Sequence, residues 1–266
     1  MADMTRVITI ANQKGGVGKT TSTVNIAAAI AQAGHSVLVI DLDPQGNAST
    51  ALGINHHEGT PSTYEVLTGE MSLMDVVQAC PDIPGLMAAP ATIDLAGSEI
   101  ELVTAEGREY RLKRALEAYL AAADNPPDFV FLDCPPSLGL LTLNGLVGAW
   151  EVLLPIQCEY YALEGLSQLL RTVDMVKAHL NPDLVVSAIL LTMYDGRTRL
   201  ASQVADEVRR HFGARVLTTV IPRSVRVSEA PSYGQTVVTY DPVSSGAVAY
   251  REAAQEILAL SSTLST

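Results

Sequence analysis

A glycine-rich segment near the start of the sequence has the composition of a loop that binds nucleotide phosphates. It reads Lys14-Gly15-Gly16-Val17-Gly18-Lys19-Thr20, follows a short apolar run and opens a helix-like segment. Glycines let successive backbone N–H groups point at phosphate oxygens, and the start of a helix adds partial positive charge. Lys19 would then reach the β- and γ-phosphates, and the Thr20 hydroxyl would ligate Mg²⁺. The spacing predicts a site for ATP or ADP with Mg²⁺, with Thr21 as a further nucleotide contact.

Two segments that contain aspartate also follow apolar runs. The first reads Asp41-Leu42-Asp43-Pro44-Gln45-Gly46-Asn47, and the second reads Phe129-Val130-Phe131-Leu132-Asp133-Cys134-Pro135-Pro136. A carboxylate at the end of a buried strand can orient a water molecule near the γ-phosphate or hold Mg²⁺ through water. The second segment has the pattern of a Walker B strand, and we assign Asp133 to Mg²⁺ through water. Turn formation alone could explain the first segment, so its role stays open at this point.

One departure from the usual phosphate-loop pattern narrows the class of protein. The pattern G-x-x-x-x-G-K-S/T expects glycine where this chain has Gln13, and an extra lysine, Lys14, follows it. In both respects the chain resembles the deviant Walker A class, which includes the ParA/Soj, MinD and nitrogenase iron proteins. The resemblance implies that Lys14 reaches the nucleotide of a second subunit. It also implies that Asp43 positions the attacking water and that Asp41 supports the loop or the water shell of the metal.

Short apolar runs alternate with longer helical patterns along the chain. This alternation predicts an α/β fold, a mostly parallel twisted sheet with helices on both faces, as in P-loop NTPases. We expect one ATPase domain over residues 1–266, and only short helices and loops between Asn47 and Gly107. Strands are predicted at Val7–Ala11, Ser36–Asp41, Phe129–Asp133, Val152–Ile156, Val185–Leu191 and Val216–Ile221. Helices are predicted at Lys19–Ala33, Arg108–Ala122, Leu163–Ala178, Thr198–Phe212 and Ser244–Leu260.

The composition limits the partners of the protein. Of its 266 residues 48% are hydrophobic and 17% are charged, and the formal net charge is -12. No apolar run reaches the ~20 residues of a membrane-spanning helix, and the N-terminus carries no targeting signal. A cytoplasmic protein without stable membrane insertion is therefore expected. Because an acidic body repels DNA, any DNA contact must come from local arginines. Cys80, Cys134 and Cys158 show no metal-like pairing and are interpreted as buried free thiols.

A segment late in the chain narrows the resemblance to the ParA/Soj family of partitioning proteins. Residues 221–234 read IPRSVRVSEAPSYG, a stretch more specific than any phosphate loop, and the resemblance extends from Val7 to Tyr250. It implies that Pro222 and Ser224 contact the adenine base. The N-terminal helix-turn-helix domain of larger plasmid relatives is not expected, because only a few residues precede the first predicted strand.

Four arginines are candidates for DNA binding: Arg197, Arg199, Arg223 and Arg226. Arg197 and Arg226 match positions that contact DNA in the ParA/Soj family. Guanidinium groups that bind phosphate oxygens carry no base information, so binding should be independent of sequence and sensitive to salt. The alternative is that these are ordinary solvated charges in a loop and at a helix start.

The resemblance also implies a cycle. Two ATP-bound monomers would form a sandwich homodimer that binds nonspecific double-stranded DNA on the bacterial nucleoid. A ParB/Spo0J-like centromere-binding partner would stimulate slow hydrolysis of ATP, and hydrolysis would release the DNA.

Two other classes of function stay open. A MinD-like ATPase directed to a membrane or protein partner would need a basic amphipathic helix at its C-terminus, whereas residues 251–260 are amphipathic but acidic. The second open class is a nucleotide-sensing scaffold or a P-loop enzyme that phosphorylates or ligates a small molecule. Such an enzyme would need a second substrate pocket, and the sequence offers no residues for one.

Overall fold

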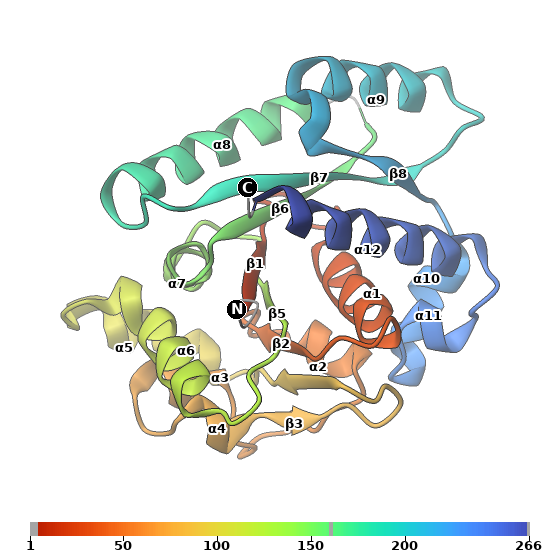
Figure 1. Ribbon diagram of the computed structural model, residues 1–266. Helices are drawn as coiled ribbons and strands as arrows, with labels where there is room; N and C mark the ends of the chain where they lie inside the picture. The colour runs from red at the N-terminus through yellow and green to blue at the C-terminus, as the bar shows by residue number, and fades with distance from the viewer. Residues whose placement is uncertain (1–4, 160–161, 265–266) are drawn as a thin grey trace.

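A twisted sheet of eight strands runs through the centre of the molecule (Figure 1). The computed structural model describes residues 5–159 and 162–264. Within them the strand order is β3-β4-β2-β5-β1-β6-β7-β8, and only β3 is antiparallel to its neighbour. The strands are β1 (Arg6–Ile10), β2 (Val37–Asp41), β3 (Gln78–Ala79), β4 (Leu86–Ala89), β5 (Phe129–Asp133), β6 (Glu151–Gln157), β7 (Val185–Tyr194) and β8 (Val216–Pro222).

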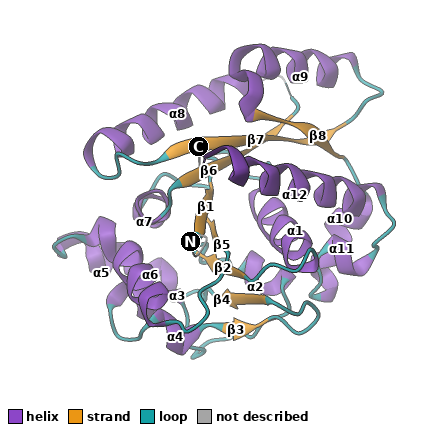
Figure 2. Ribbon diagram, in the orientation of Figure 1, coloured by secondary structure: helices purple, strands orange, loops and turns teal. Residues whose placement is uncertain are grey.

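Helices cover both faces of this sheet (Figure 2). One face packs against α1, α2, α11 and α12, and the other packs against α3 to α9. The helices are α1 (Lys19–Gln32), α2 (Asn47–Ala51), α3 (Thr63–Thr68), α4 (Leu73–Val76), α5 (Leu95–Glu101), α6 (Arg111–Ala122), α7 (Leu140–Gly148), α8 (Ala162–His179), α9 (Arg199–Phe212), α10 (Val225–Glu229), α11 (Val237–Tyr240) and α12 (Ser245–Leu264). Short 3-10 turns are η1 (Leu102–Thr104), η2 (Arg108–Tyr110), η3 (Gly213–Arg215) and η4 (Ala230–Tyr233).

The central strands are buried on both faces. Along β1, Val7 packs into the cluster on the α6–α9 side and Ile8 into the cluster on the α1–α12 side, and Val130 and Phe131 of β5 divide in the same way. Side chains of a strand point alternately to its two faces. Apolar residues therefore occupy most positions, with the buried Thr9 of β1 as an exception, which is why these strands appear as largely apolar runs in the sequence.

The predicted α/β fold is confirmed, and each of the six predicted strands is present within three residues of its predicted bounds. The predicted helix at residues 108–122 divides into η2 and α6. The expectation for residues 47–107 was wrong in part, because β3 and β4 lie there and β4 pairs with β2. β4 contains leucine, methionine and alanine, which favour helices, and its place beside β2 overrides that preference. The apolar helix α7 was also not predicted.

No helix among the described residues is long and apolar enough to cross a membrane.

Candidate nucleotide site and arginine surface

The glycine-rich loop joins β1 to α1 at the carboxyl edge of the sheet. Gly16 and Gly18 have positive φ angles of 75° and 88°, a left-handed conformation that glycine adopts more readily than residues with a Cβ. Gly18 is the N-cap of α1 and has no side chain with which to cap the helix. The first N–H groups of α1 are therefore suited to bind an anion.

Two polar side chains that sequence reasoning missed hold this loop in place. Asn12 accepts a hydrogen bond from the Lys14 backbone N–H at 3.0 Å and donates one to the Pro155 carbonyl at 2.7 Å. The Thr192 hydroxyl donates to the Val17 carbonyl at 2.8 Å. The loop is thus tied to β6 and β7. Asn12 could have been noticed as an Asx-turn residue directly before the motif, whereas Thr192 lies 175 residues from its partner and gives no local signal.

The loop borders a cavity of about 320 Å³. Most of the predicted nucleotide contacts line it, and so does Asp43, which lies after β2. Val17, Lys14 and Asp133 do not line it. The site residues predicted from the sequence that line this cavity are Gly15, Gly16, Gly18, Lys19, Thr20, Thr21 and Asp43. The other lining residues are Val24, Asn47, Thr50, Ala51, Pro136 and Pro231.

Lys19 lies buried at the base of the loop. Its Nζ donates to the Lys14 carbonyl at 3.3 Å, and only 6% of the residue is exposed. Burial lowers the pKa of Lys19, while Asp133, Cys134 and Asp43 oppose the shift. Since a phosphate would add negative charge next to this ammonium group, binding of a nucleotide would favour its charged form.

Three carboxylates, those of Asp41, Asp43 and Asp133, lie beside the loop. They come together because β2 and β5 are neighbouring strands, with Asp41 opposite Asp133 in register. Asp133 accepts hydrogen bonds from Thr20 at 2.7 Å and from Thr23 at 2.8 Å. Burial, and then the charge of Asp41, raises the pKa of Asp133. Asp41 accepts from the backbone N–H and the hydroxyl of Ser49 at 2.9 and 2.8 Å, and burial raises its pKa as well.

The donor set here fits Mg²⁺. Among the described residues no group of three or more histidine, cysteine or acidic side chains forms a closed metal cage. Mg²⁺ usually keeps several waters and takes only one or two protein oxygens together with substrate phosphates. A hydroxyl from Thr20 in contact with the buried carboxylate of Asp133 is that kind of set, and the mutual repulsion of buried carboxylates favours a cation nearby.

Lys14 is engaged within its own chain. Its Nζ forms an ion pair with Glu159, just after β6, and 44% of the lysine side chain is exposed. The assignment of Lys14 to a second subunit's nucleotide stays a prediction. The structure adds that Glu159 holds this lysine in the monomer.

The adenine contacts also remain predictions. Pro222 ends β8 and Ser224 is the N-cap of α10, and neither lines the cavity. Pro231 of η4 lines it instead.

Cys134 supports the interpretation of a buried structural thiol. It is fully buried, and burial raises its pKa to about 12, so the reactive thiolate form is disfavoured. Cys80 and Cys158 are buried and free as well.

The four candidate DNA-binding arginines lie around the ends of β7 and β8. The Arg223 backbone N–H donates to the Tyr194 carbonyl at 3.2 Å, which brings the two strand ends together. Arg197 binds both oxygens of Asp195, at 2.9 and 2.8 Å. Arg226 contacts Glu229 at 3.1 Å and Asp241 at 3.4 Å. Arg199 and Arg223 are exposed and form no salt bridge among the described residues.

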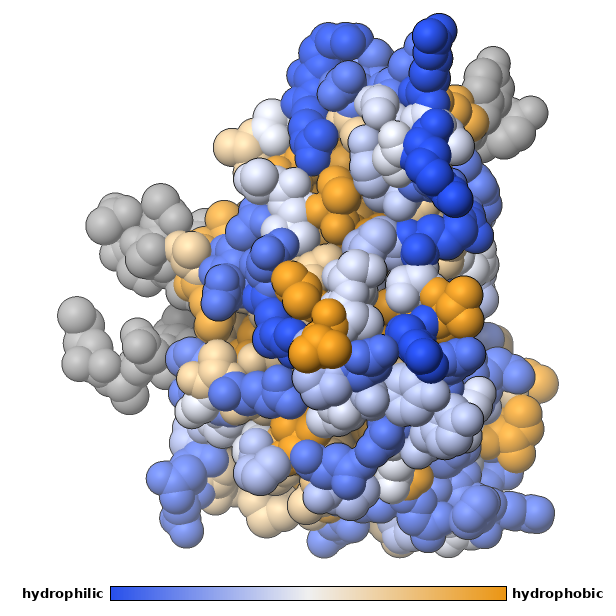
Figure 3. Space-filling model, turned by 90° about the vertical axis from the view of Figure 1, so that its right-hand side faces the viewer, coloured by the Kyte–Doolittle hydropathy of each residue, from blue (hydrophilic) through white to orange (hydrophobic). Residues whose placement is uncertain are grey.

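Figure 3 views the molecule from the side on which α10 and α11 lie in Figure 1. Strongly hydrophilic residues gather at its top, the level of α9, and hydrophobic residues interrupt the surface lower down. Exposed apolar side chains on α10, α12 and the preceding loop include Val225, Val243 and Val248. Because the formal net charge is -12, attraction of DNA to this side would have to come from the local arginines.

Comparison with known proteins places this geometry in a family. Residues 5–186 match a family model described as an AAA domain. The chain is 51% identical over 256 residues to the sporulation initiation inhibitor protein Soj of Bacillus subtilis, covering 96% of this chain and 99% of that protein. It is 50% identical over 257 residues to the chromosome partitioning protein ParA of Caulobacter vibrioides, covering 97% of this chain and 95% of that protein.

Solved structures agree on the fold. A Mycobacterium smegmatis structure, described as cobyrinic acid a,c-diamide synthase with bound ATP analogue and magnesium, is 42% identical with a TM-score of 0.82, over 96% of this chain and 95% of that one. The septum site-determining protein MinD of Pyrococcus horikoshii, solved with Mg-ADP, is 25% identical with a TM-score of 0.75, over 96% of each chain. With the phosphate loop, the buried carboxylates and relatives at half identity over nearly the whole length, this chain belongs to the ParA/Soj family of chromosome-partitioning P-loop ATPases.

Proposed function

We propose that this chain is an ATP-driven switch for DNA segregation, in which ATP with Mg²⁺ promotes dimerisation and nonspecific DNA binding and hydrolysis ends both. The observation that carries this proposal is the presence of a buried carboxylate, Asp43, in the same cavity as the phosphate loop. Lys19, Thr20 and Asp43 line one cavity of about 320 Å³. The nucleotides named for the solved relatives support the same cofactors.

Each residue has a distinct role in the proposed cycle. The loop N–H groups and Lys19 would bind the phosphates, and Thr20 and Asp133 would hold the metal. Bound Mg²⁺ would neutralise charge that develops on the phosphates. Asp43 accepts a hydrogen bond from the attacking water and orients it. Because the chain offers no evident second base, intrinsic turnover should be slow, and a ParB-like partner would accelerate it.

Dimerisation would require Lys14 to exchange partners. In the monomer its ammonium group pairs with Glu159. In the sandwich dimer it would bind the nucleotide phosphates of the other subunit, a contact with more negative charge than one carboxylate. Joining two subunits would also place two arginine surfaces side by side, so that DNA is held bivalently. The dimer would then reside on the nucleoid within the cytoplasm.

A mobility-shift assay with a DNA duplex of scrambled sequence, at low salt, tests the switch. DNA should bind with ATP and should not bind with ADP or without nucleotide. Lys19→Ala is the control, since loss of the phosphate-binding lysine should abolish the effect of ATP. Equal affinity with ATP and ADP would contradict the proposal, and binding to vesicles instead of DNA would favour the MinD-like alternative.

The exchange of Lys14 predicts that Glu159→Gln strengthens ATP-dependent dimerisation. An exposed ion pair contributes little, so the dimer dissociation constant, measured by sedimentation with ATP, should fall by about two- to fivefold. Glu207→Gln, which removes an exposed ion pair on α9, is the matched control and should leave dimerisation unchanged. Weaker dimerisation in Glu159→Gln would mean that Glu159 serves the dimer and does not restrain Lys14.

A small-molecule enzyme is the weaker alternative. The name of the Mycobacterium smegmatis relative denotes a synthase, and such a reaction needs a second substrate beside the nucleotide. The other large cavity, about 450 Å³, shares no lining residue with the nucleotide cavity. A substrate there would not reach the phosphates, so the partitioning switch is favoured.

A further inference from the structure

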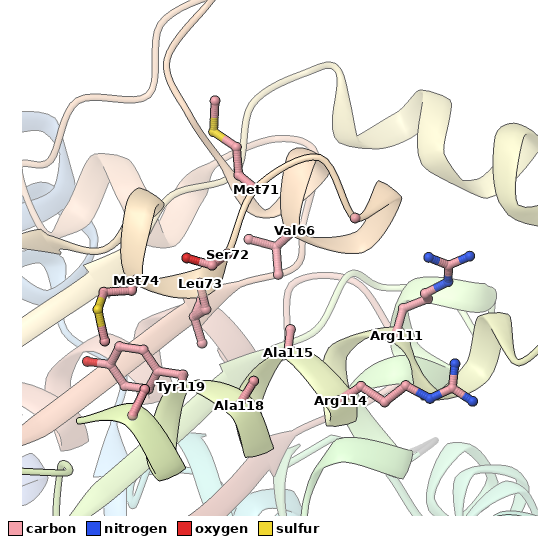
Figure 4. A pocket seen from close by; sticks show the side chains of 12 residues that line it. Val66, Met71, Ser72, Leu73, Met74, Arg111, Arg114, Ala115, Ala118 and Tyr119 are labelled. Carbon is pink, nitrogen blue, oxygen red and sulfur yellow. The ribbon is translucent and has the colours of Figure 1, made fainter.

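A cavity of about 450 Å³ lies between the α3–α4 segment and α6 (Figure 4). We call it the α6 groove. Along α6 its lining extends from Arg111 to Ala122, three helical turns or about 16 Å. None of these residues lines the nucleotide cavity, and none is among the four candidate DNA-binding arginines. The α6 groove is therefore a separate feature of this fold.

The walls of the α6 groove are apolar and adaptable. Met71 and Met74 line it, and the exposed fractions of these two residues are 40% and 51%. Methionine is flexible and is common on surfaces that accept peptides. On the α6 side, Ala115, Ala118 and Ala122 follow one face of the helix at helical spacing, and such small side chains let a second helix approach closely. Unpartnered apolar surface of this kind favours a protein partner over water.

Two arginines give the groove a charged end. Figure 4 shows the guanidinium groups of Arg111 and Arg114 at the same end of the groove, away from Met71 and Met74. A Cβ built on Gly69 would lie 3.4 Å from Nη1 of Arg111, so this guanidinium reaches across the groove to the end of α3.

Neither arginine has an acidic partner. Among the described residues neither forms a salt bridge, and the buried Nε of Arg111 has no hydrogen-bond partner. A buried donor without a partner is costly. In a chain of net charge -12, two cations at one end of the groove would attract a carboxylate.

We propose that the α6 groove binds a helical segment of a partner protein, with apolar residues against α3, α4 and α6 and a carboxylate on Arg111 and Arg114. Charge complementarity selects this occupant. A planar guanidinium binds a carboxylate bidentately, and an amphipathic helix can lay its apolar face into a groove of this length. A nucleic acid fits poorly, because its phosphates would pass over the apolar wall.

The groove has a short connection to the nucleotide site. α3 begins at Thr63, whose hydroxyl donates to the Asp41 carbonyl at 2.9 Å, two residues before Asp43. A partner in the groove would therefore contact a helix whose first residue is hydrogen-bonded to the end of β2. Binding in the groove is nevertheless independent of the proposed switch, since it requires neither ATP nor a dimer.

A displayed library of helix-favouring peptides of about 12 residues, a length that spans the groove at about 1.5 Å per residue, is panned against the whole protein without nucleotide and tests the proposal. Enriched peptides should carry apolar residues at helical spacing and glutamate or aspartate near one end. The best peptide is then synthesised, and its affinity is measured by fluorescence anisotropy. The same peptide with lysine in place of its acidic residues should bind about tenfold more weakly or worse.

Variants of α6 locate the site. Ala118→Trp should fill the groove and Arg114→Glu should repel the peptide, each weakening binding about tenfold or more. Ala121→Trp and Lys113→Glu are the matched controls on the same helix, because neither residue lines the groove, and both should bind within about twofold of the original. Failure to enrich any peptide, a basic consensus, or equal effects of lining and control variants would each overturn the proposal.

Discussion

Replacing Asp43 with alanine is expected to slow ATP hydrolysis by about a hundredfold or more, the usual contribution of a group that positions a reacting proton. Asp43 lines the nucleotide cavity and is buried, with 6% exposed. ATP should still bind, because the loop and Lys19 are intact. The protein should then accumulate as an ATP-bound dimer that stays on DNA. Release of phosphate from radiolabelled ATP measures the first effect, and DNA dissociation after dilution of ATP measures the second.

Asp43→Asn is the sharper form of this experiment. Oδ1 of Asp43 accepts a hydrogen bond from the Gln45 backbone N–H at 3.0 Å, and the asparagine oxygen can preserve that turn. The asparagine variant should therefore keep the loop but lose the negative charge that we propose orients the water. Hydrolysis at the original rate in Asp43→Asn would show that another group positions the water. Loss of ATP binding in both variants would instead assign Asp43 a structural role.

Reversing the charge of Arg226 to glutamate is expected to lower the affinity of the ATP-bound protein for nonspecific DNA by about tenfold or more. In a dimer each substitution removes two phosphate contacts, so the slope of log affinity against log salt should decrease by about two. Arg197→Glu should act in the same way. Anisotropy titrations of a labelled duplex at several salt concentrations measure both quantities. Unchanged DNA binding in both variants would place the DNA elsewhere on the protein.

The acidic neighbours of these arginines provide an internal control. Hydrogen bonds from Arg197 lower the pKa of Asp195 to about 2, so this carboxylate is ionised at neutral pH and would compete with DNA phosphate for the guanidinium. Glu229 competes for Arg226 in the same way. Asp195→Asn and Glu229→Gln should therefore raise DNA affinity. A loss of affinity would indicate that the ion pairs hold the arginines in their binding geometry.

The parts that could be predicted from the sequence share a physical basis. Central parallel strands are apolar at most positions, so β1, β2 and β5 were evident as runs, and Asp133 was located because it ends one of them. The glycines of the phosphate loop were recognisable because a left-handed backbone near an anion needs them. The family followed from residues 221–234, a resemblance that the comparisons confirm.

The parts that were missed depend on contacts between distant segments. β4 is four residues of helix-favouring composition that becomes a strand because β2 lies beside it. Thr192 and Pro155 support the phosphate loop from other strands, and Glu159 pairs with Lys14 across a similar separation. The lining of the α6 groove comes from α3, α4, the turn between them and α6. None of these contacts leaves a pattern at a single place in the chain.

The contacts from β6 and β7 to the phosphate loop determine when, during synthesis, this loop can reach its folded conformation. The strand that precedes the phosphate loop is the fifth in the sheet, flanked by β5 and β6, and these neighbours are synthesised much later. Pairing over such separations is slow, because the intervening chain must be ordered first. The carbonyl of Val17 gains its partner only after residue 192 has left the ribosome. A nascent chain therefore carries the complete glycine motif long before it can hold the motif in shape, so the protein acquires its affinity for nucleotide late in its synthesis.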